Sequence, residues 1–371
     1  MHRALLARFT LSASVGLLLA CESNRPFEPS ATPALARPQP AASGFATLTK
    51  LPSLGKGVHG EAYAVQQTGS IIAGYSWHRD GRMIPVTWTL QNGAWTITSL
   101  PYPATATSAR AKAVNDQGDV GGNDWPGSTP HALLWPSSGG FQVLGCNDEL
   151  GEVFGMSAGG RTLVGVVSPW QNPVAGSPAR AAVWEPGQCR VDLPPLVEGS
   201  SARADAVNGN GNVVGGSAFS GARNVPVRWT RANGAWTITA LDSRQGAVRG
   251  ANSAGDLVGT VIVPCAASET GCNRGMIWYA AGGTRELPTL GGSSTTPVGI
   301  NAAREVVGLS ALANEEGTAF IWSETMGMRQ LPVTGGAWAF AVSGVRADCT
   351  RLVVGAGGDK FSALVWVVRN P

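Results

Sequence analysis

One pentapeptide of this sequence has the spacing of a catalytic nucleophile. Residues 155–159, with Ser157 at the centre, match the G-x-S-x-G pattern, in which a serine on a strand-to-helix turn works with a partner histidine. Here the pentapeptide lies between two short β-rich runs, where a hairpin turn is expected. Only His59, His78 and His131 remain once the expected leader peptide is removed. We therefore interpret the motif as a turn and assign no catalytic residue.

Two polar runs, residues 115–119 and 208–212, alternate side-chain oxygens in the manner of a calcium loop. Calcium loops depend on several carboxylates, one of them bidentate, and these runs consist mostly of asparagine and glutamine. Because asparagine is a preferred turn residue, tight turns explain the runs more simply. The three histidines are not at metal-ligand spacing from one another. We expect no metal and no cofactor.

An acidic cluster, Asp148, Glu149 and Glu152, could supply an acid/base pair. Hydrophilic surface loops are far more common than catalytic pairs, so a solvated loop is the favoured interpretation. Glycoside hydrolysis needs two positioned carboxylates, and no such pair recurs along the chain. The acidic residues therefore give little support to an enzyme.

Four aromatic residues share a position that favours binding. Trp77, Trp125 and Trp170 follow the glycine of a β-rich run by three to five residues in consecutive repeats, and Phe219 is similarly placed in the next. We expect all four in loops between second and third strands, on one face of the fold. Aromatic rings on such loops can stack against sugar rings. The alternative is that each ring folds down over its own repeat.

The elements that position these residues repeat along the chain. Tryptophans recur at gaps of 44 to 49 residues, and each closes a short apolar run. The seven are Trp88, Trp135, Trp184, Trp229, Trp278, Trp322 and Trp366. A period of this length indicates a solenoid, a propeller or an array. Rings at one strand position in every repeat are expected to fill the core.

Each repeat can be divided into four short strands. Residues 297–301, 305–310, 318–322 and 327–332 are rich in β-branched or aromatic residues and are bounded by Gly, Asn, Ser or Pro. Asn92-Gly93 and Asn233-Gly234 join the third and fourth strands of two repeats and are strong hairpin signals. The repeats therefore predict antiparallel four-stranded units.

Seven such units predict an all-β fold, a seven-bladed β-propeller over residues 45–371. The seventh repeat ends without a fourth strand, whereas Phe45–Pro52 resembles the fourth strands of other repeats. We expect this N-terminal strand to complete the last blade, because closing the ring leaves no sheet edge at the seam.

The repeats resemble the HAF-type extracellular repeat of bacterial exported proteins. Residues 208–215, 131–135 and 287–292 match its three parts, and the resemblance spans residues 45–371. The His of the motif is kept once, as His131, while Thr318, Arg180 and Arg274 hold its place elsewhere. The resemblance implies an exported β-rich repeat protein without a defined activity.

The first 21 residues read as a leader peptide with a basic start and a short apolar run. Their end, Leu18-Leu19-Ala20-Cys21, resembles the lipobox of bacterial lipoproteins and implies lipidation of Cys21. An ordinary secretory signal is the alternative. Residues 22–44 are rich in Pro and Ala and are expected to form a tether. We expect an exported protein, lipid-anchored at the cell envelope or surface.

The cysteines that follow can form disulfides in an exported protein. Cys265 and Cys272 lie in one loop and are the expected pair, Cys146 and Cys189 could also join, and Cys349 is left over. Zinc is the competing interpretation, but paired C-x-x-C units are missing and histidine is scarce.

The charge of the mature chain is nearly balanced. The leader holds two of the 27 basic residues, which leaves 25 against 24 acidic ones. Without a basic patch, nucleic acid is not an expected partner. We expect a monomer that touches the membrane only through its anchor. The function that follows is a non-catalytic surface module that binds a glycan or a surface protein, and the alternative is an extracellular polysaccharide hydrolase or lyase.

Overall fold

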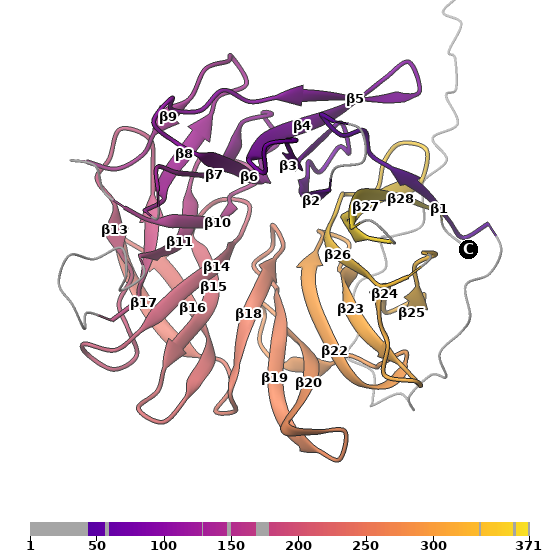
Figure 1. The fold of residues 1–371 in the computed structure, drawn as a ribbon. Helices are drawn as coiled ribbons and strands as arrows, with labels where there is room; N and C mark the ends of the chain where they lie inside the picture. The colour runs from indigo at the N-terminus through magenta and orange to yellow at the C-terminus, as the bar shows by residue number, and fades with distance from the viewer. Residues whose placement is uncertain are drawn as a thin grey trace, which may run out of the picture. The chain divides into compact units, whose positions relative to one another are not determined.

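Seven four-stranded antiparallel sheets form the fold (Figure 1). The computed structural model describes residues 44–55, 59–127, 129–146, 150–167, 178–333, 335–358 and 361–369, all in strands, turns and loops. No helix in these ranges could cross a membrane. The first strand of each sheet contacts the first strands of both neighbouring sheets, so the seven first strands close a ring around one axis. The chain is a seven-bladed β-propeller, as the repeats predicted.

Each blade runs from its first strand at the axis to its fourth strand at the rim. Blades 1 and 2 comprise β2 (Gly60–Val65), β3 (Ile71–Trp77), β4 (Met83–Gln91), β5 (Ala94–Ser99), β6 (Ser108–Val114), β7 (Val120–Trp125), β8 (His131–Trp135) and β9 (Gln142–Val143). Blades 3 and 4 comprise β10 (Glu152–Met156), β11 (Leu163–Val167), β12 (Arg180–Trp184), β13 (Val191–Asp192), β14 (Ala202–Val207), β15 (Val213–Phe219), β16 (Asn224–Ala232) and β17 (Ala235–Ala240).

The remaining blades follow the same order, except for the last strand. Blades 5 and 6 comprise β18 (Gly246–Ala251), β19 (Leu257–Cys265), β20 (Ser268–Trp278), β21 (Thr284–Glu286), β22 (Gly291–Ile300), β23 (Val306–Leu312), β24 (Gly317–Ser323) and β25 (Gly327–Gln330). Blade 7 comprises β26 (Ala337–Val342), β27 (Thr350–Gly357), β28 (Ser362–Arg369) and β1 (Ala46–Lys50).

The N-terminal strand completes the ring, which confirms the sequence prediction. β1 pairs antiparallel with β28, from Ala46 opposite Val368 to Lys50 opposite Leu364, and Figure 1 shows the two side by side. The amide of Arg369 also donates to the Phe45 carbonyl at 3.0 Å. Phe45 is buried in the same apolar cluster as Trp366.

The strand directions define two faces. On the front face the second strands end and the first strands begin; the back face carries the turns between first and second strands and between third and fourth strands. β28 is a third strand and therefore ends on the back face, where it meets Phe45. The described chain thus begins on the back face, at Gly44 and Phe45.

The seven repeat tryptophans form the core between blades, and each is at most 2% exposed. Four of their indole N–H groups bond to a proline carbonyl just after the fourth strand of the preceding blade. The pairs are Trp88 with Pro52 (2.7 Å), Trp135 with Pro101 (2.5 Å), Trp229 with Pro194 (2.8 Å) and Trp366 with Pro332 (2.8 Å). These four bonds from tryptophan to proline carbonyls thus join successive blades.

Every first strand carries a β-bulge opposite a glycine of the second strand. A side chain at that glycine would collide with the bulged backbone: a Cβ on Gly165 would lie 1.8 Å from the Glu152 carbonyl oxygen. The equivalent glycines are Gly74, Gly122, Gly165, Gly216, Gly259, Gly308 and Gly355. A bulge turns one side chain out of the strand ladder. Each blade therefore has one such side chain on its first strand, beside the axis.

On the back face, the asparagine turns of one blade form hydrogen bonds with the next blade, an arrangement that we call a latch. Asn115 accepts the amide of Asp119 at 2.8 Å, and its Nδ2 donates to the Gly160 carbonyl of the next blade at 2.8 Å. Arg161, also of the next blade, donates to Asp119 at 2.7 Å. Asn252, Asp256 and Arg304 repeat the arrangement between blades 5 and 6. The asparagines are therefore turn and latch residues, and the described residues hold no cluster of three metal-binding side chains.

These latches predict a loss of stability in acid. Burial alone would raise the pKa of Asp119, but hydrogen bonds from Arg161, the Ser137 amide and Asn115 lower it to about 2. The pKa of Asp256 is likewise lowered, because bonds led by Arg304 outweigh its burial. A carboxyl whose pKa is lower in the folded protein stabilises the fold above its unfolded value of 3.8, and that stability is lost as the pH falls toward 2.

Asp119→Asn combined with Asp256→Asn should therefore lower the stability at pH 7 and flatten its dependence on pH between 4 and 2. Urea unfolding at several pH values measures both effects. Glu198→Gln, on an exposed loop, serves as a control that should change neither. An unchanged slope in the double variant would contradict the role of the latches.

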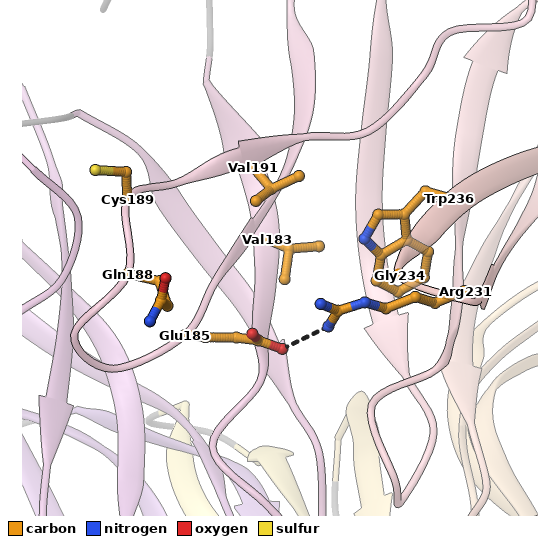
Figure 2. Close-up of a pocket in the computed structure, with 8 residues that line it drawn as sticks. All are labelled: Val183, Glu185, Gln188, Cys189, Val191, Arg231, Gly234 and Trp236. Carbon is orange, nitrogen blue, oxygen red and sulfur yellow. Dashed lines mark hydrogen bonds and ion pairs between the residues drawn. The ribbon is translucent and has the colours of Figure 1, made fainter.

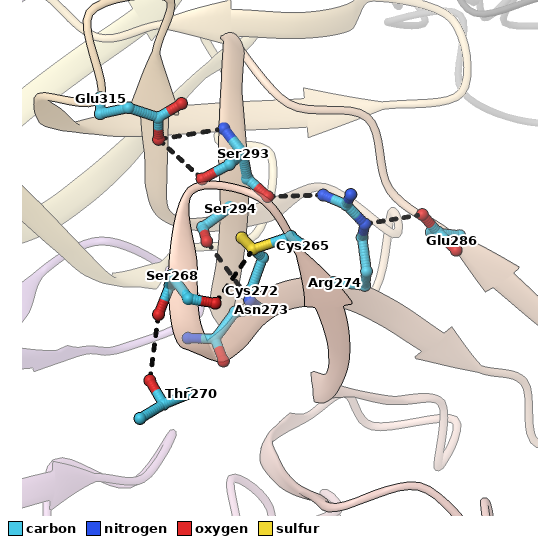
Figure 3. The surroundings of a disulfide bond; sticks show 10 residues. All are labelled: Cys265, Ser268, Thr270, Cys272, Asn273, Arg274, Glu286, Ser293, Ser294 and Glu315. Atoms are coloured by element: carbon cyan, nitrogen blue, oxygen red, sulfur yellow. Dashed lines mark hydrogen bonds and ion pairs between the residues drawn. A yellow bond between two sulfur atoms is a disulfide. The ribbon is translucent and has the colours of Figure 1, made fainter.

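Two disulfides join cysteines of the described residues, Cys146–Cys189 and Cys265–Cys272, and no described cysteine is a free thiol. Cys265 and Cys272 cross-link the β19–β20 hairpin, which confirms the predicted pairing, although both lie on its strands and not in a loop (Figure 3). Arg274 of this hairpin reaches the Ser293 carbonyl of blade 6 at 2.5 Å. Two disulfides indicate a non-cytoplasmic protein. Cys21 and its lipidation lie outside the described residues.

Candidate functional site

The aromatic residues singled out from the sequence lie at strand ends. Trp77, Trp125 and Phe219 are the last residues of β3, β7 and β15, so they belong to the second strands and not to the loops after them. All three are on the front face and half-buried. Trp170 lies outside the described residues, as do Asp148 and Glu149 of the acidic cluster. The Ser157 turn joins β10 to β11, and Ser157 Oγ accepts the Thr162 amide at 3.1 Å.

The bulges form a second set of candidate residues, which we call the bulge ring. It holds one side chain from each blade: Tyr63, Lys112, Phe154, Asp205, Arg249, Val298 and Phe340. Tyr63 lies 5.4 Å from Phe340 between ring centroids, and Lys112 Nζ lies 3.5 Å from the Tyr63 ring. Arg249 lies 3.5 Å from Asp205. These contacts cross from one blade to the next around the axis.

A continuous chain of aromatic rings runs outward from the bulge ring over blades 7 and 1. Trp338 stacks on Phe340 at 6.4 Å, and Phe340 contacts Tyr63. Tyr63 lies 5.8 Å from Tyr75, and Tyr75 meets Trp77 edge-on at 6.1 Å. Trp338, at 37% exposed, is the most accessible of the five rings. The chain gives the front face a partly exposed aromatic surface beside the axis.

Arg110 extends this surface onto blade 2. Its guanidinium carbon lies 5.4 Å from the centre of the Tyr75 ring and 4.9 Å from that of Trp125. Two of the four aromatic residues predicted as a platform, Trp77 and Trp125, are therefore connected through Tyr75 and Arg110. Phe219, on blade 4, is not part of this chain of contacts. We call the five rings together with Arg110, Lys112 and Trp125 the axial surface.

Both tyrosines of the axial surface are held in their neutral form. Burial raises the pKa of Tyr63 well above its usual value, and the charge of Glu61 and a hydrogen bond to it add to the effect. The same causes raise the pKa of Tyr75, whose hydroxyl donates to Glu61 at 2.8 Å. A nucleophile or general base needs a lowered pKa or an adjacent base. The two hydroxyls therefore suit hydrogen bonding better than catalysis.

Lys112 is the charged group most affected by this environment. Burial lowers its pKa to about 8, and the charges of Arg110 and Arg203 add to the effect against the opposing charges of Glu61 and Glu152. Charged groups from blades 1 to 4 therefore act together on the Lys112 ammonium group. Arg203 itself lies over the Phe154 ring at 3.8 Å and pairs with Asp205 at 2.7 Å.

A groove lined by residues of blades 3 and 4 lies beside their fourth strands, and Figure 2 shows its side chains. Glu185 and Arg231 form an ion pair at 2.9 Å across it, and Arg231 lies 5.8 Å from the centre of the Trp236 ring. The groove opens beside the fourth strands β13 and β17 and includes Cys189 of a disulfide. Its charges are already paired, so it is a weaker candidate than the axial surface.

Comparisons with known proteins identify the fold only. No protein-family model and no curated protein matches the chain. Among solved structures, a Mycobacterium tuberculosis puromycin-hydrolyzing peptidase is 13% identical with a TM-score of 0.53, and the match covers 86% of this chain and 54% of that one. TolB from Acinetobacter baumannii is 9% identical with a TM-score of 0.42, over 81% of this chain and 64% of that one.

A sialidase from Trypanosoma rangeli is 14% identical with a TM-score of 0.41, over 84% of this chain and 55% of that one. The chain thus spans about half to two thirds of the length of these proteins. At such identities the likeness shows the β-propeller fold and no activity.

Proposed function

We propose that the protein is a non-catalytic binding module that takes a glycan on its axial surface. The observation that carries the proposal is the unbroken chain of ring contacts from Trp338 to Trp77, in which every ring except the buried Tyr75 is partly exposed, continued by Arg110 and Trp125. Aromatic rings bury large apolar areas while tyrosine keeps a polar group for hydrogen bonds. This combination suits saccharides, which present apolar ring faces and many hydroxyls.

The path of the chain supports this assignment. The described chain begins with Gly44 and Phe45 on the back face, opposite the ends of β3 and β7. If Cys21 is lipidated, as its motif suggests, the tether attaches to the face opposite the axial surface. The front face is then presented away from the membrane, where extracellular glycans are accessible.

The test is a triple substitution on the axial surface, Trp77→Ala, Trp125→Ala and Trp338→Ala. We expect the wild-type propeller to bind a subset of saccharides on a glycan array. The triple variant should lose about 100-fold in affinity, at roughly 1 kcal/mol for each ring. Calorimetry with the strongest array hit measures the loss.

Trp236→Ala, in the groove near the rim, is the matched control and should bind like the wild type. Both variants should melt within a few degrees of the wild type, because partly exposed rings contribute little to stability. A wild-type protein that binds no saccharide on the array would reject the proposal, and so would a triple variant with unchanged affinity. Capture of a surface protein in place of a glycan would identify the other partner class.

The alternative function, a polysaccharide hydrolase or lyase, rests on Glu61 and Glu152. The charges of both act on Lys112, which lies on the blade between theirs. Release of new reducing ends from an array hit, abolished in Glu61→Gln and Glu152→Gln, would establish catalysis. Binding without turnover would favour the non-catalytic module.

A further inference from the structure

Two cations of the axial surface have no carboxylate partner. Arg110 and Lys112 form no ion pair with any described residue, whereas Arg161, Arg304 and Arg203 each contact an aspartate at 2.7 Å. Arg110 and Lys112 lie on the same strand, β6, and pack against the rings of Tyr75 and Tyr63. They are half-buried, so water only partly replaces the missing partner.

Lys112 lies among charged groups of both signs, and none of them is an ion-pair partner of Lys112 or Arg110. Those that face Lys112 are Glu61 and Tyr63 of β2, Arg110 of its own strand, Glu152 of β10 and Arg203 of β14. Arg203 already pairs with Asp205, which leaves Arg110 and Lys112 near Glu61 and Glu152 without a contact to either carboxylate. Placing charged groups together without partners costs stability, so such an arrangement is typical of a binding site.

The geometry of Arg110 leaves part of its guanidinium free for a ligand. The group packs against the rings of Tyr75 and Trp125, which restricts its orientation. Among the described residues, its one hydrogen bond goes from Nε to Met83 Sδ at 2.9 Å. The terminal nitrogens can therefore donate to an anion, and a planar guanidinium binds a carboxylate through two parallel bonds.

We infer that the ligand of the axial surface is an acidic saccharide, whose carboxylate binds Arg110 and Lys112 while its sugar rings pack against the neighbouring aromatic side chains. This inference rests on the proposed function and specifies its ligand class. A carboxylate supplies the ion-pair partner that Arg110 and Lys112 lack among the described residues, and a saccharide supplies the apolar faces that the aromatic rings match. A free inorganic anion would satisfy the cations but would leave the rings without a partner.

Binding of an acidic saccharide should be coupled to the protonation of Lys112. Lys112 loses its charge as the pH rises through about 8 in the free protein. An anion beside it favours the charged form and raises this pKa, so binding near pH 8 should take up a fraction of a proton. The affinity for an acidic saccharide should therefore fall between pH 7 and 9.5, and the affinity for a neutral one should not.

The experiment compares oligogalacturonate with the same oligosaccharide after methyl esterification, together with a glycan array of acidic and neutral saccharides. The proteins are the wild type, Arg110→Gln, Lys112→Met and the charge-matched control Arg369→Gln on the back face. We expect the array hits to be acidic, esterification to abolish binding, and each axial variant to lose about tenfold or more in affinity. Arg369→Gln should bind like the wild type.

Lys112→Met provides the decisive pH test. It should melt close to the wild type, because Lys112 has no ion pair among the described residues to lose and its charged form is disfavoured by burial, and its residual binding should no longer depend on pH between 7 and 9.5. Calorimetry at pH 8 in two buffers of different ionisation enthalpy should show proton uptake for the wild type alone. A structural role for Lys112 would not produce this pattern.

The outcomes separate the two proposals. Array hits that are neutral, or an ester that binds as well as the acid, would overturn the acidic ligand and leave glycan binding intact. Binding of acidic peptides but of no saccharide would reject both. A wild-type affinity for the acid that stays constant from pH 7 to 9.5 would exclude the coupling to Lys112.

Discussion

A protein that begins at Gly55 should unfold far more easily than one that begins at Gly44. The truncation removes β1 and with it Phe45 and Leu51, both buried. It also removes the Pro52 carbonyl that accepts the Trp88 indole N–H at 2.7 Å. Each buried apolar side chain stabilises the fold by about 1.5 to 3 kcal/mol. Against a typical net stability of roughly 5 to 15 kcal/mol, the combined loss should leave the ring partly unfolded near room temperature.

Thermal and urea unfolding measure this effect, with the protein that begins at Gly44 as the control. That control keeps β1 and should unfold like the longer chain. A synthetic peptide of residues 44–54 added to the truncated protein should restore part of the loss, because it can pair with the exposed edge of β28. If the protein beginning at Gly55 melts like the control, β1 contributes nothing to closure.

The fold could be predicted from the sequence because its core repeats. A large buried ring at one strand position in every blade leaves a period in the chain, and Trp88 and its six equivalents are indeed at most 2% exposed. The hairpin turns could also be predicted from the sequence. Asn92-Gly93 and Asn233-Gly234 adopt positive φ values of 50° to 81°, as two-residue hairpins require. The fourth strand of blade 7 could be predicted because a sequence that resembles the other fourth strands stands at the start of the domain, at Phe45–Pro52.

Most residues of the axial surface were not predicted from the sequence, because the residue pattern of a strand does not reveal a β-bulge. A sequence feature that marks the bulge is nevertheless present. In each repeat one variable and mostly large residue stands between smaller ones just before the turn, as in Ala62-Tyr63-Ala64, Ala111-Lys112-Ala113 and Ala204-Asp205-Ala206. The small neighbours are buried, apart from the half-buried Ala64, and the variable residue is the one that the bulge turns toward the axis.

The contacts within the axial surface could not have been predicted, since they depend on which side chains the bulges turn toward the axis. Trp338 lies far from Tyr63 in the chain, yet blade 7 is the neighbour of blade 1 in the closed propeller. Trp77 and Trp125 were chosen for their shared position after a glycine. Their connection runs through Tyr75 and Arg110, which no spacing rule had selected.

Two tryptophans of blade 2 should respond in opposite ways to the same substitution. Trp135 is 2% exposed, packs in an apolar cluster with Val120 and Leu133, and donates to the Pro101 carbonyl of the preceding blade. Trp135→Ala should therefore cost about 3 to 5 kcal/mol through the cavity that it leaves. Trp125, only half-buried at the end of β7, packs mainly against Arg110, and Trp125→Ala should change stability by less than about 1 kcal/mol.

Urea unfolding of the two variants, together with saccharide binding at a temperature where both are folded, provides the comparison. Trp135→Ala should keep the affinity of the wild type, because its side chain is buried between blades and is not part of the axial surface. Trp125→Ala should keep the stability and lose affinity. Equal losses of stability would show that Trp125 is a core residue, and the axial surface would then have to end at Trp77. The opposite responses expected here separate the residues that hold the propeller together from those that it presents to a ligand.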